Sequence, residues 1–217
     1  MKLSAVIFDM DGVIFDTERL CLESWKQAGT KYGLTDIDDI FPDCIGSAEF
    51  VTRRLFAERY GKDFPYDDFR AAAAVIFRSA AIPNGFPKKA GIEELLAYLK
   101  ERGAKLGVAS STVTERVITE LSEASLDRYF DVITGGDSVS RSKPAPDIFL
   151  HCLSLLGVPE DEAIIIEDSH NGVRAAANAG IRCIMVPDLL PPTEETDRLT
   201  YMTLPSLIEV KKHLALM

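Results

Sequence analysis

Residues 5–13, which read AVIFDMDGV, constrain the possible folds of this chain more than any other segment. The three bulky apolar residues at 6–8 follow one another without a polar break, as is typical of a buried strand. Asp9 and Asp11 come next, and in an extended segment side chains two positions apart point to the same side. Ligands of open parallel sheets bind at the carboxyl ends of strands, so we expect both carboxylates to face one ligand.

The simpler interpretation of Asp9, Asp11 and Gly12 is a strand that ends in an Asp-Gly turn, because both residue types are common in turns. Two neighbouring carboxylates, however, repel each other and need a proton or a cation between them. Mg²⁺ suits carboxylate oxygens and is the natural compensating ion. Matching groups at the ends of later strands would favour the metal site over the turn.

Length and charge narrow the class of protein. The chain has 217 residues, which predicts one core domain with an insertion rather than two full domains. A formal net charge of −10 argues against unspecific nucleic-acid binding, which depends on a cationic surface. An anionic substrate stays compatible with this charge if a metal ion or a lysine lies at the site.

Three further features point to a cytoplasmic protein. The segment before Asp9 is too short for a signal peptide, and no apolar run approaches the roughly 18 to 20 residues of a membrane span. The cysteines lack the short-spaced pairs of a zinc site and are expected to be thiols in a reducing compartment. No membrane association and no obligate protein partner are implied. The cysteines are Cys21, Cys44, Cys152 and Cys183.

Residues 17–84 contain no strand-like run and are predicted to form a helical insertion. The segment 83–87, which holds two prolines and a glycine, is expected to be its closing connector. Helices are predicted from about 16 to 32, from 48 to 60 and from 67 to 81, with an aspartate-rich loop at 36–43.

Beyond residue 85 strands and helices alternate, which predicts an α/β fold with parallel strands and helices on both faces. Thr112 and Glu115 have the spacing of a capping box at the start of one helix. After the last strand we expect a loop and a final helix. The predicted strands cover 105–109, 132–134, 163–166 and 183–186, and the predicted helices cover 92–102, 113–122, 147–156, 172–179 and 204–213.

Three groups after later strands match the position of the first two aspartates. Ser110 follows a strand and precedes a helix, where free N–H groups favour a phosphate, although such a serine is more often a helix cap. Lys143 lies between a turn and two prolines, which restrain its backbone, although most lysines are simply on the surface. Glu167 and Asp168 end another apolar run, with a helix N-cap as the alternative interpretation.

Together these groups resemble the motifs of the haloacid dehalogenase superfamily, in particular its phosphatase and β-phosphoglucomutase-like branch. The resemblance spans the whole chain. It implies a Rossmann-like three-layer core formed by residues 1–16 and 85–217, and a helical cap domain, residues 17–84, inserted after the first strand. The matching segments are DMDGV at 9–13, ASS at 109–111, KPAPD at 143–147 and EDS at 167–169.

The resemblance implies a Mg²⁺-dependent phosphatase that hydrolyses a small phosphorylated metabolite, such as a sugar phosphate. Asp9 would be the nucleophile that forms an aspartyl phosphate. Asp11 would protonate the leaving alcohol and then deprotonate the attacking water. Ser110, Ser111 and Lys143 would bind the phosphoryl oxygens, with Ser110 and Lys143 counted among the catalytic residues.

The same resemblance implies the metal ligands. Mg²⁺ would be held by the side chain of Asp9, the backbone carbonyl of Asp11 and the side chain of Asp168, with Glu167 as a further candidate. Such an ion offsets the charge that develops during phosphoryl transfer.

Two departures from the mutases of this branch favour a hydrolase over the alternative, a β-phosphoglucomutase-like sugar-phosphate mutase. Cys21 stands where the mutases carry a cap histidine, and Ala48 and Glu49 stand where they carry a phosphate-binding arginine. Arg53 or Arg54 could replace that arginine, although exposed arginines on a helix face are the simpler interpretation. A phosphate sensor without turnover is disfavoured, because no catalytic residue is missing.

Overall fold

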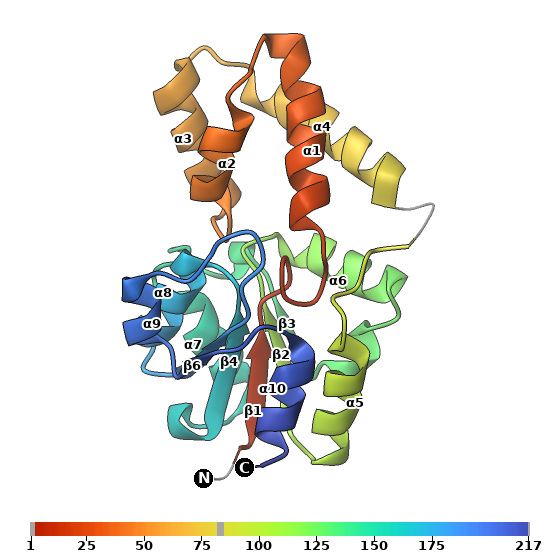
Figure 1. The fold of residues 1–217 in the computed structure, drawn as a ribbon, viewed down its shortest axis with the longest axis vertical. Coiled ribbons are helices and arrows are strands. Elements are labelled where there is room, and N and C mark those ends of the chain that lie inside the picture. Colours follow the sequence, from red (N-terminus) through yellow and green to blue (C-terminus); the bar gives the residue numbers. More distant parts are fainter. Residues whose placement is uncertain (1–2, 82–84, 217) are drawn as a thin grey trace.

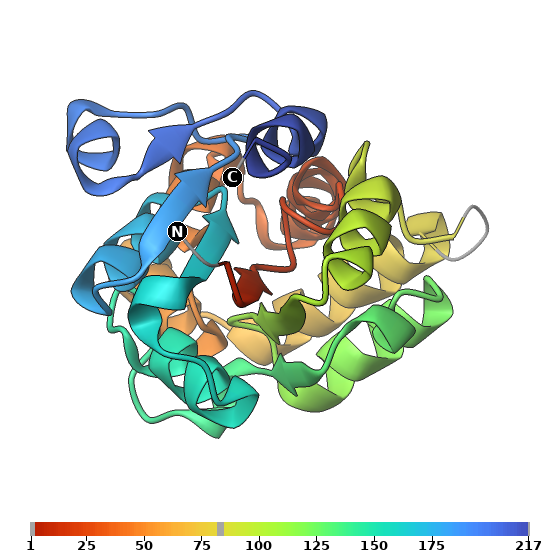
Figure 2. The same cartoon turned by 90° about the horizontal axis from the view of Figure 1, so that it is seen from below.

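The computed structural model describes residues 3–81 and 85–216. Among these residues, six parallel strands form one sheet in the order β3-β2-β1-β4-β5-β6, with helices on both of its faces (Figures 1 and 2). The α/β, Rossmann-like fold is therefore confirmed. The strands are β1 (Ala5–Phe8), β2 (Lys105–Ala109), β3 (Val132–Thr134), β4 (Ala163–Glu167), β5 (Arg182–Met185) and β6 (Met202–Thr203).

Strand β1 lies in the middle of the sheet, paired in parallel with β2 on one side and β4 on the other. All four of its residues are completely buried, because the alternating side chains enter two different hydrophobic clusters. Val6 and Phe8 pack with α5, α6 and α10, whereas Ala5 and Ile7 pack with α7 and α8. These helices are α5 (Ile92–Glu101), α6 (Thr114–Glu123), α7 (Asp147–Leu156), α8 (His170–Asn178) and α10 (Leu207–Leu214).

A second group of helices stands beyond the carboxyl ends of the strands (Figure 1) and is called the cap here. Its own hydrophobic cluster is built around Trp25, Phe41, Phe56 and Phe69, whose rings meet edge-on or tilted. The proposed domain boundary near residue 84 stays a prediction, since residues 83 and 84 of the expected connector lie outside the described residues. The cap helices are α1 (Glu18–Gly29), α2 (Ile37–Cys44), α3 (Glu49–Tyr60) and α4 (Tyr66–Ala81).

The prediction of an aspartate-rich loop at 36–43 is wrong, because this segment forms helix α2. Four apolar side chains at helical spacing, Ile37, Ile40, Phe41 and Cys44, are buried against the cap cluster. Burial of this face outweighs the low helix propensity of the aspartates and of the proline inside the helix.

Two further predictions need correction. Helix α6 has Val113 as its N-cap and no capping side chain, so the box of Thr112 and Glu115 does not form. The segment expected to be a loop after β5 contains helix α9 (Glu194–Leu199), which begins with a capping box of Thr193 and Thr196, and the short strand β6.

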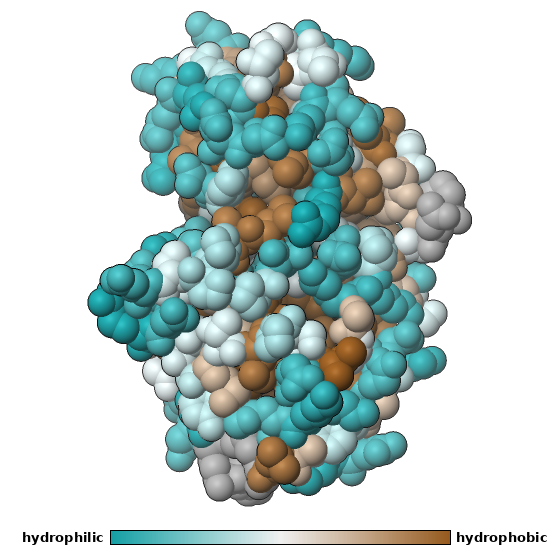
Figure 3. All heavy atoms as spheres, in the orientation of Figure 1, coloured by the Kyte–Doolittle hydropathy of each residue, from teal (hydrophilic) through white to brown (hydrophobic). Residues whose placement is uncertain are grey.

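The surface is mostly polar in the view of Figure 3, with hydrophobic side chains at the junction of cap and core and in further patches on the cap and on the lower half of the core. No helix within the described residues combines the length and the apolar character that a membrane crossing requires.

Candidate active site

The predicted groups meet at one edge of the sheet. Strands β2, β1 and β4 are neighbours in parallel, so Ser110, Asp9 and Glu167 come to the same edge at their carboxyl ends. Lys143 reaches this edge from the loop before α7, and Asp168 follows β4 directly. All five side chains are buried, each with at most 5% of its surface exposed, although four of them are ionisable.

Lys143 links three acceptors of the core. Its Nζ donates to Asp9 Oδ1 at 2.5 Å, to Glu167 Oε1 at 2.7 Å and to the carbonyl of Ala109 at 3.2 Å. Burial opposes its charge, but the adjacent carboxylates of Asp9 and Glu167 raise the pKa of Lys143 above its ordinary value. An ammonium has three donors, so all of them bind protein atoms here and none is left for a phosphoryl oxygen.

Glu167 is held on both carboxylate oxygens. Oε1 accepts from Lys143, and Oε2 accepts from the backbone N–H groups of Asp168 and Ser169 and from the hydroxyl of Ser169. A side chain at Gly172 would lie 1.7 Å from Oε1, so only glycine leaves room for this carboxylate. The arrangement positions Lys143 and leaves Glu167 poorly placed to approach a metal ion directly.

Asp9, Glu167 and Asp168 bring carboxylate oxygens within 4.8 Å of one another. Burial raises the pKa of Asp9 to about 8, against the opposing effect of Lys143. Burial, and then the charges of Glu167 and Asp9, raise the pKa of Asp168 well above its ordinary value. Burial and the neighbouring carboxylates thus make both carboxyls costly to ionise.

Asp168 Oδ2 is buried and has no hydrogen-bond partner among the described residues. Gly12 faces it with φ at +80°, and a Cβ at Gly12 would lie only 2.1 Å from this oxygen. An unpaired carboxylate oxygen beside a second carboxylate is the donor set that Mg²⁺ prefers. The residues at this edge therefore fit the expected ion.

Asp11 lies outside that acidic cluster. Its Oδ1 accepts a hydrogen bond from the Thr17 hydroxyl at 3.0 Å, and its Oδ2 one from the Thr112 hydroxyl at 3.4 Å. The two threonines orient a carboxylate that lines the cavity described below, as a proton-transfer group must be oriented. Sequence reasoning missed both threonines, although Thr17 follows the first motif by only a few residues.

The two serines after β2 have different surroundings. Both line the cavity, and the hydroxyl of Ser110 accepts from the N–H of Thr112 at 3.1 Å. Ser111 donates its hydroxyl to the carbonyl of Gly46 in the cap at 2.9 Å. Ser111, predicted to bind phosphate, thus holds the cap in this structure.

A cavity of about 210 Å³ separates the core from the cap. The core lines it with Asp9, Asp11 and Ser110, and the cap lines it with an apolar and a basic group, Trp25 and Arg70. Its volume is below the about 300–1,000 Å³ of typical drug-sized pockets, so it suits a small ligand.

Two of the three residues at which this chain departs from the mutases line the same cavity. Cys21 and Glu49 line it, whereas Arg53 pairs with Asp67 and Arg54 pairs with Glu58 on the surface of the cap. Burial raises the pKa of Cys21 to about 12, so its thiol stays protonated.

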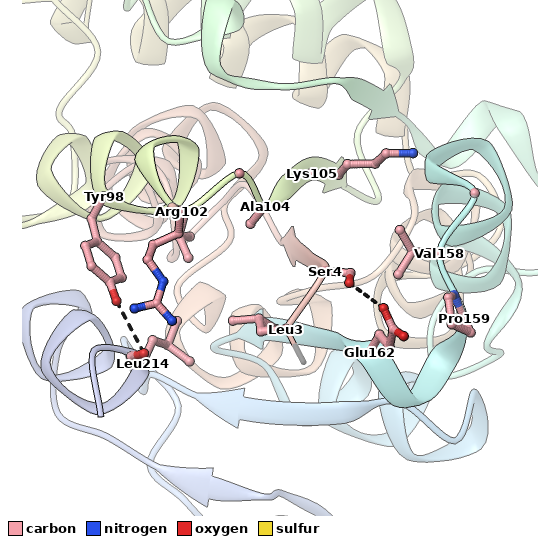
Figure 4. Close-up of a pocket in the computed structure, with 13 residues that line it drawn as sticks. Leu3, Ser4, Tyr98, Arg102, Ala104, Lys105, Val158, Pro159, Glu162 and Leu214 are labelled. Atoms are coloured by element: carbon pink, nitrogen blue, oxygen red, sulfur yellow. Dashed lines mark hydrogen bonds between the residues drawn. The ribbon is translucent and has the colours of Figure 1, made fainter. Parts of the chain in front are cut away.

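A larger cavity, of about 690 Å³, lies at the opposite end of the sheet, beside the amino ends of β1 and β2 (Figure 4). Two of its polar side chains already have partners: the Ser4 hydroxyl donates to Glu162 (Figure 4), and Lys105 donates to the carbonyl of Leu156 at 2.5 Å. None of the predicted catalytic residues lines it, so the smaller cavity is the candidate active site.

Comparisons with known proteins identify the family of this chain. A family model described as haloacid dehalogenase-like hydrolase matches residues 6–186. The phosphorylated carbohydrates phosphatase of Thermotoga maritima is 32% identical over 182 residues, covering 84% of each chain. Protein CbbY of Cereibacter sphaeroides is 32% identical over 207 residues, covering 89% of this chain and 88% of the relative.

Solved structures extend the likeness to the whole fold. The crystal structure of CbbY from Rhodobacter sphaeroides in complex with phosphate has a TM-score of 0.78 and 29% identity, with 96% of each chain covered. The resemblance seen in the four sequence motifs is confirmed. This chain belongs to the haloacid dehalogenase-like hydrolase family.

Proposed function

We propose that this protein is a Mg²⁺-dependent phosphatase that hydrolyses a small phosphomonoester, a sugar phosphate or a similar metabolite, through an aspartyl phosphate at Asp9. The observation that carries the proposal is the buried contact of Asp9 with Lys143, next to the unpaired oxygen of Asp168, on the floor of a small cavity. Relatives named as phosphatases, including one of phosphorylated carbohydrates, support the activity and the substrate class.

In the first step a carboxylate oxygen of Asp9 attacks phosphorus. The bond from Asp9 to phosphorus forms, the bond from phosphorus to the ester oxygen breaks, and Asp11 gives its proton to the departing alcohol. Burial raises the pKa of Asp9 even beside Lys143, so the positive charge of Lys143 reduces the cost of ionising this carboxyl without removing it. The cap held through Ser111 keeps bulk water out during this step.

In the second step water attacks the phosphorus of the aspartyl phosphate. Asp11, now ionised, takes a proton from this water, the bond to Asp9 breaks, and inorganic phosphate leaves. Thr17 and Thr112 hold the Asp11 carboxylate in one orientation for both proton transfers.

For the metal, we propose Asp9, Asp168 and the backbone carbonyl of Asp11 as the protein ligands. When bound, Mg²⁺ offsets negative charge so that a carboxylate and a phosphate can approach each other. Glu167 remains the least suited candidate ligand, because four donors already occupy its two oxygens. Its proposed role is to position Lys143.

The test compares the wild-type protein, Asp9→Asn and a control, Asp127→Asn, which changes an exposed aspartate. Phosphate release from an aryl phosphate and from a panel of sugar phosphates is measured with Mg²⁺ and with EDTA. Asp9→Asn and EDTA should each abolish release, while Asp127→Asn should behave as wild type. Full activity of Asp9→Asn would reject the proposed nucleophile.

The same assay separates hydrolase from mutase. β-Glucose 1-phosphate with a glucose bisphosphate primer should give free phosphate and no glucose 6-phosphate. The hydrolase is favoured because Cys21 and Glu49, at positions where the mutases carry a cap histidine and a phosphate-binding arginine, line this cavity. Accumulation of glucose 6-phosphate would instead establish the mutase.

A further inference from the structure

Two arginines that no sequence motif singled out line the candidate active site. Arg70 comes from α4 of the cap and Arg116 from α6 of the core, and both reach the cavity that Asp9 closes at its floor. The proposed reaction uses Asp9, Asp11 and Lys143 for the phosphate that is cleaved. It assigns nothing to these two guanidinium groups.

Arg70 has no ionic partner in the part of the chain that the structure describes. Its guanidinium carbon lies 4.9 Å from the centre of the Trp25 ring, and no ion pair or hydrogen bond to a described residue satisfies its N–H groups. Stacking uses the flat face of the guanidinium and leaves the donors at its edge available. The Trp25 ring, which also lines the cavity, thus fixes an unpaired cation at its wall.

Other cap arginines show what Arg70 lacks. Arg53 pairs with Asp67, Arg54 with Glu58 and Arg59 with Asp36, and all three pairs are on the surface. Arg70 is partly buried and faces the cavity instead.

Arg116 is already partly neutralised. Its Nε donates to the buried carboxylate of Glu120 at 2.6 Å, and its guanidinium lies 5.8 Å from the centre of the Phe77 ring. Arg116 therefore adds positive charge to the cavity wall but is a weaker candidate than Arg70 for binding a free anion.

Carboxylates also line the cavity, and their surroundings limit their effect on Arg70. Glu49 is exposed and has Arg53 at 3.8 Å. Burial, followed by the charge of Asp11, raises the pKa of Glu18 well above its ordinary value, which favours its neutral form. Neither residue forms an ion pair with Arg70.

We propose that the substrate carries a second anionic group, a carboxylate or a phosphate, and that Arg70 binds this group while the reacting phosphate lies at Asp9. This inference rests on the proposed phosphatase function and names its substrate class. A cavity of about 210 Å³ has room for a short molecule only, so both anionic groups must lie within a few bonds of each other.

The test uses substrate pairs that differ in one anionic group. 2-Phosphoglycolate is compared with 2-hydroxyethyl phosphate, and propane-1,3-diol bisphosphate with 3-hydroxypropyl phosphate. A charge-assisted hydrogen bond in a partly buried site predicts that, in at least one pair, kcat/KM is about tenfold or more higher for the substrate with the second anionic group. The two pairs distinguish a carboxylate from a second phosphate.

Arg70→Gln should reduce that preference to below about threefold, mainly by raising KM, with the neutral-tailed substrates changed less than about twofold. Arg70→Lys should keep part of the preference, because it keeps the charge and loses the planar donors. The matched control is Arg54→Gln, another cap arginine that is exposed and paired. It should keep the wild-type preference.

Equal turnover of both members in both pairs by the wild type would overturn the inference. So would a preference that survives Arg70→Gln unchanged. Failure of the phosphatase proposal gives a different result, namely no phosphate release from any substrate or undiminished release by Asp9→Asn. The unfolding midpoint of Arg70→Gln, measured alongside, shows whether a lost preference accompanies a lost fold.

Discussion

The charged side chains at the core edge differ from those of the cap in burial and in pairing. At the edge of the sheet, Lys143, Asp9 and Glu167 are buried and every donor of the lysine is bound. In the cap, arginines form exposed pairs over an aromatic cluster, and Arg70 faces the cavity without a carboxylate partner among the described residues. The contrast matches the proposed function, in which the core carries the chemical step and Arg70 of the cap binds part of the substrate.

The energetic consequences differ in the same way. Removing one partner of a buried ion pair leaves an uncompensated charge and typically costs about 3–5 kcal/mol. Exposed pairs are solvated and screened by salt, so their loss changes stability little. Substitutions at the core edge should therefore affect folding and catalysis together, and substitutions in the cap should affect mainly recognition.

The largest effect is expected for Lys143→Met. Without the ammonium, Asp9 and Glu167 are buried together without compensation. We expect kcat to fall by about 10²- to 10³-fold. In EDTA the free energy of unfolding should fall by about 3–5 kcal/mol.

Phosphate release and urea unfolding measure these two quantities. Lys212→Met, at an exposed lysine of α10, is the control and should leave both unchanged. If Lys143→Met kept the stability and activity of the wild type, loss of a buried charge at the core edge would matter as little as loss of an exposed pair in the cap. The difference between the two regions would then be rejected.

Gly12→Ala comes next in size. Its Cβ would lie 2.1 Å from Asp168 Oδ2, so the carboxylate has to move away from its position. We expect Mg²⁺ affinity to fall by about 10- to 100-fold, as is typical when the surroundings of a metal ligand are disturbed. Mg²⁺ titration of activity and calorimetry measure this affinity.

Gly103→Ala is the control that separates the effect of the Cβ contact with Asp168 from the effect of backbone strain. Gly103 has φ at +74°, close to the +80° of Gly12, but nothing lies within 4 Å of a Cβ built there. It should lose some stability and keep wild-type Mg²⁺ affinity. An equal loss of affinity in both variants would argue against Asp168 as the metal ligand.

Ser111→Ala should have a moderate effect that identifies the role of this hydroxyl. If it serves to hold the cap, loss of its bond to Gly46 costs about 0.5–1.5 kcal/mol of cap docking. KM should then rise several-fold, and hydrogen exchange at residues 45–47 should become faster. A fall in kcat of about 100-fold or more with unchanged exchange would instead support the predicted contact with phosphate.

The smallest effect is expected at Cys21, on the cap side of the cavity. Burial raises the pKa of its thiol to about 12, so very little thiolate is present at pH 8. Alkylation of Cys21 by iodoacetamide should be at least about a hundredfold slower than that of an exposed cysteine with a pKa of about 8.5. Mass spectrometry of native and urea-unfolded protein checks this rate, and rapid native labelling would contradict it.

The core was predictable from the sequence because its signals are local. The apolar runs of β1, β2 and β4 each end in a polar group, and parallel pairing is enough to bring those ends together. Helix α2 was missed because its aspartates and proline suggested a loop. The helical spacing of the apolar residues Ile37, Ile40, Phe41 and Cys44 indicated a helix and could have predicted α2.

The cap side of the cavity was not predictable in the same way. Arg70 and Arg116 are two among many arginines on predicted helices, and which one faces a cavity depends on how two distant helices pack. The engagement of Glu167 by four donors is also a tertiary property, since it depends on Lys143 arriving from another loop.

The three acceptors around Lys143 have a consequence for successive turnovers. In the proposed mechanism Asp9 takes up a phosphoryl group, and its charge would then pass largely to the transferred oxygens, while Glu167 and the carbonyl of Ala109 would keep their places. The contacts with Glu167 and Ala109 would still hold the ammonium. The N–H that had bound Asp9 could then donate to an oxygen of the transferred phosphoryl group. The lysine would thus serve the free and the phosphorylated enzyme from a single position, without a side-chain rearrangement between the two half-reactions.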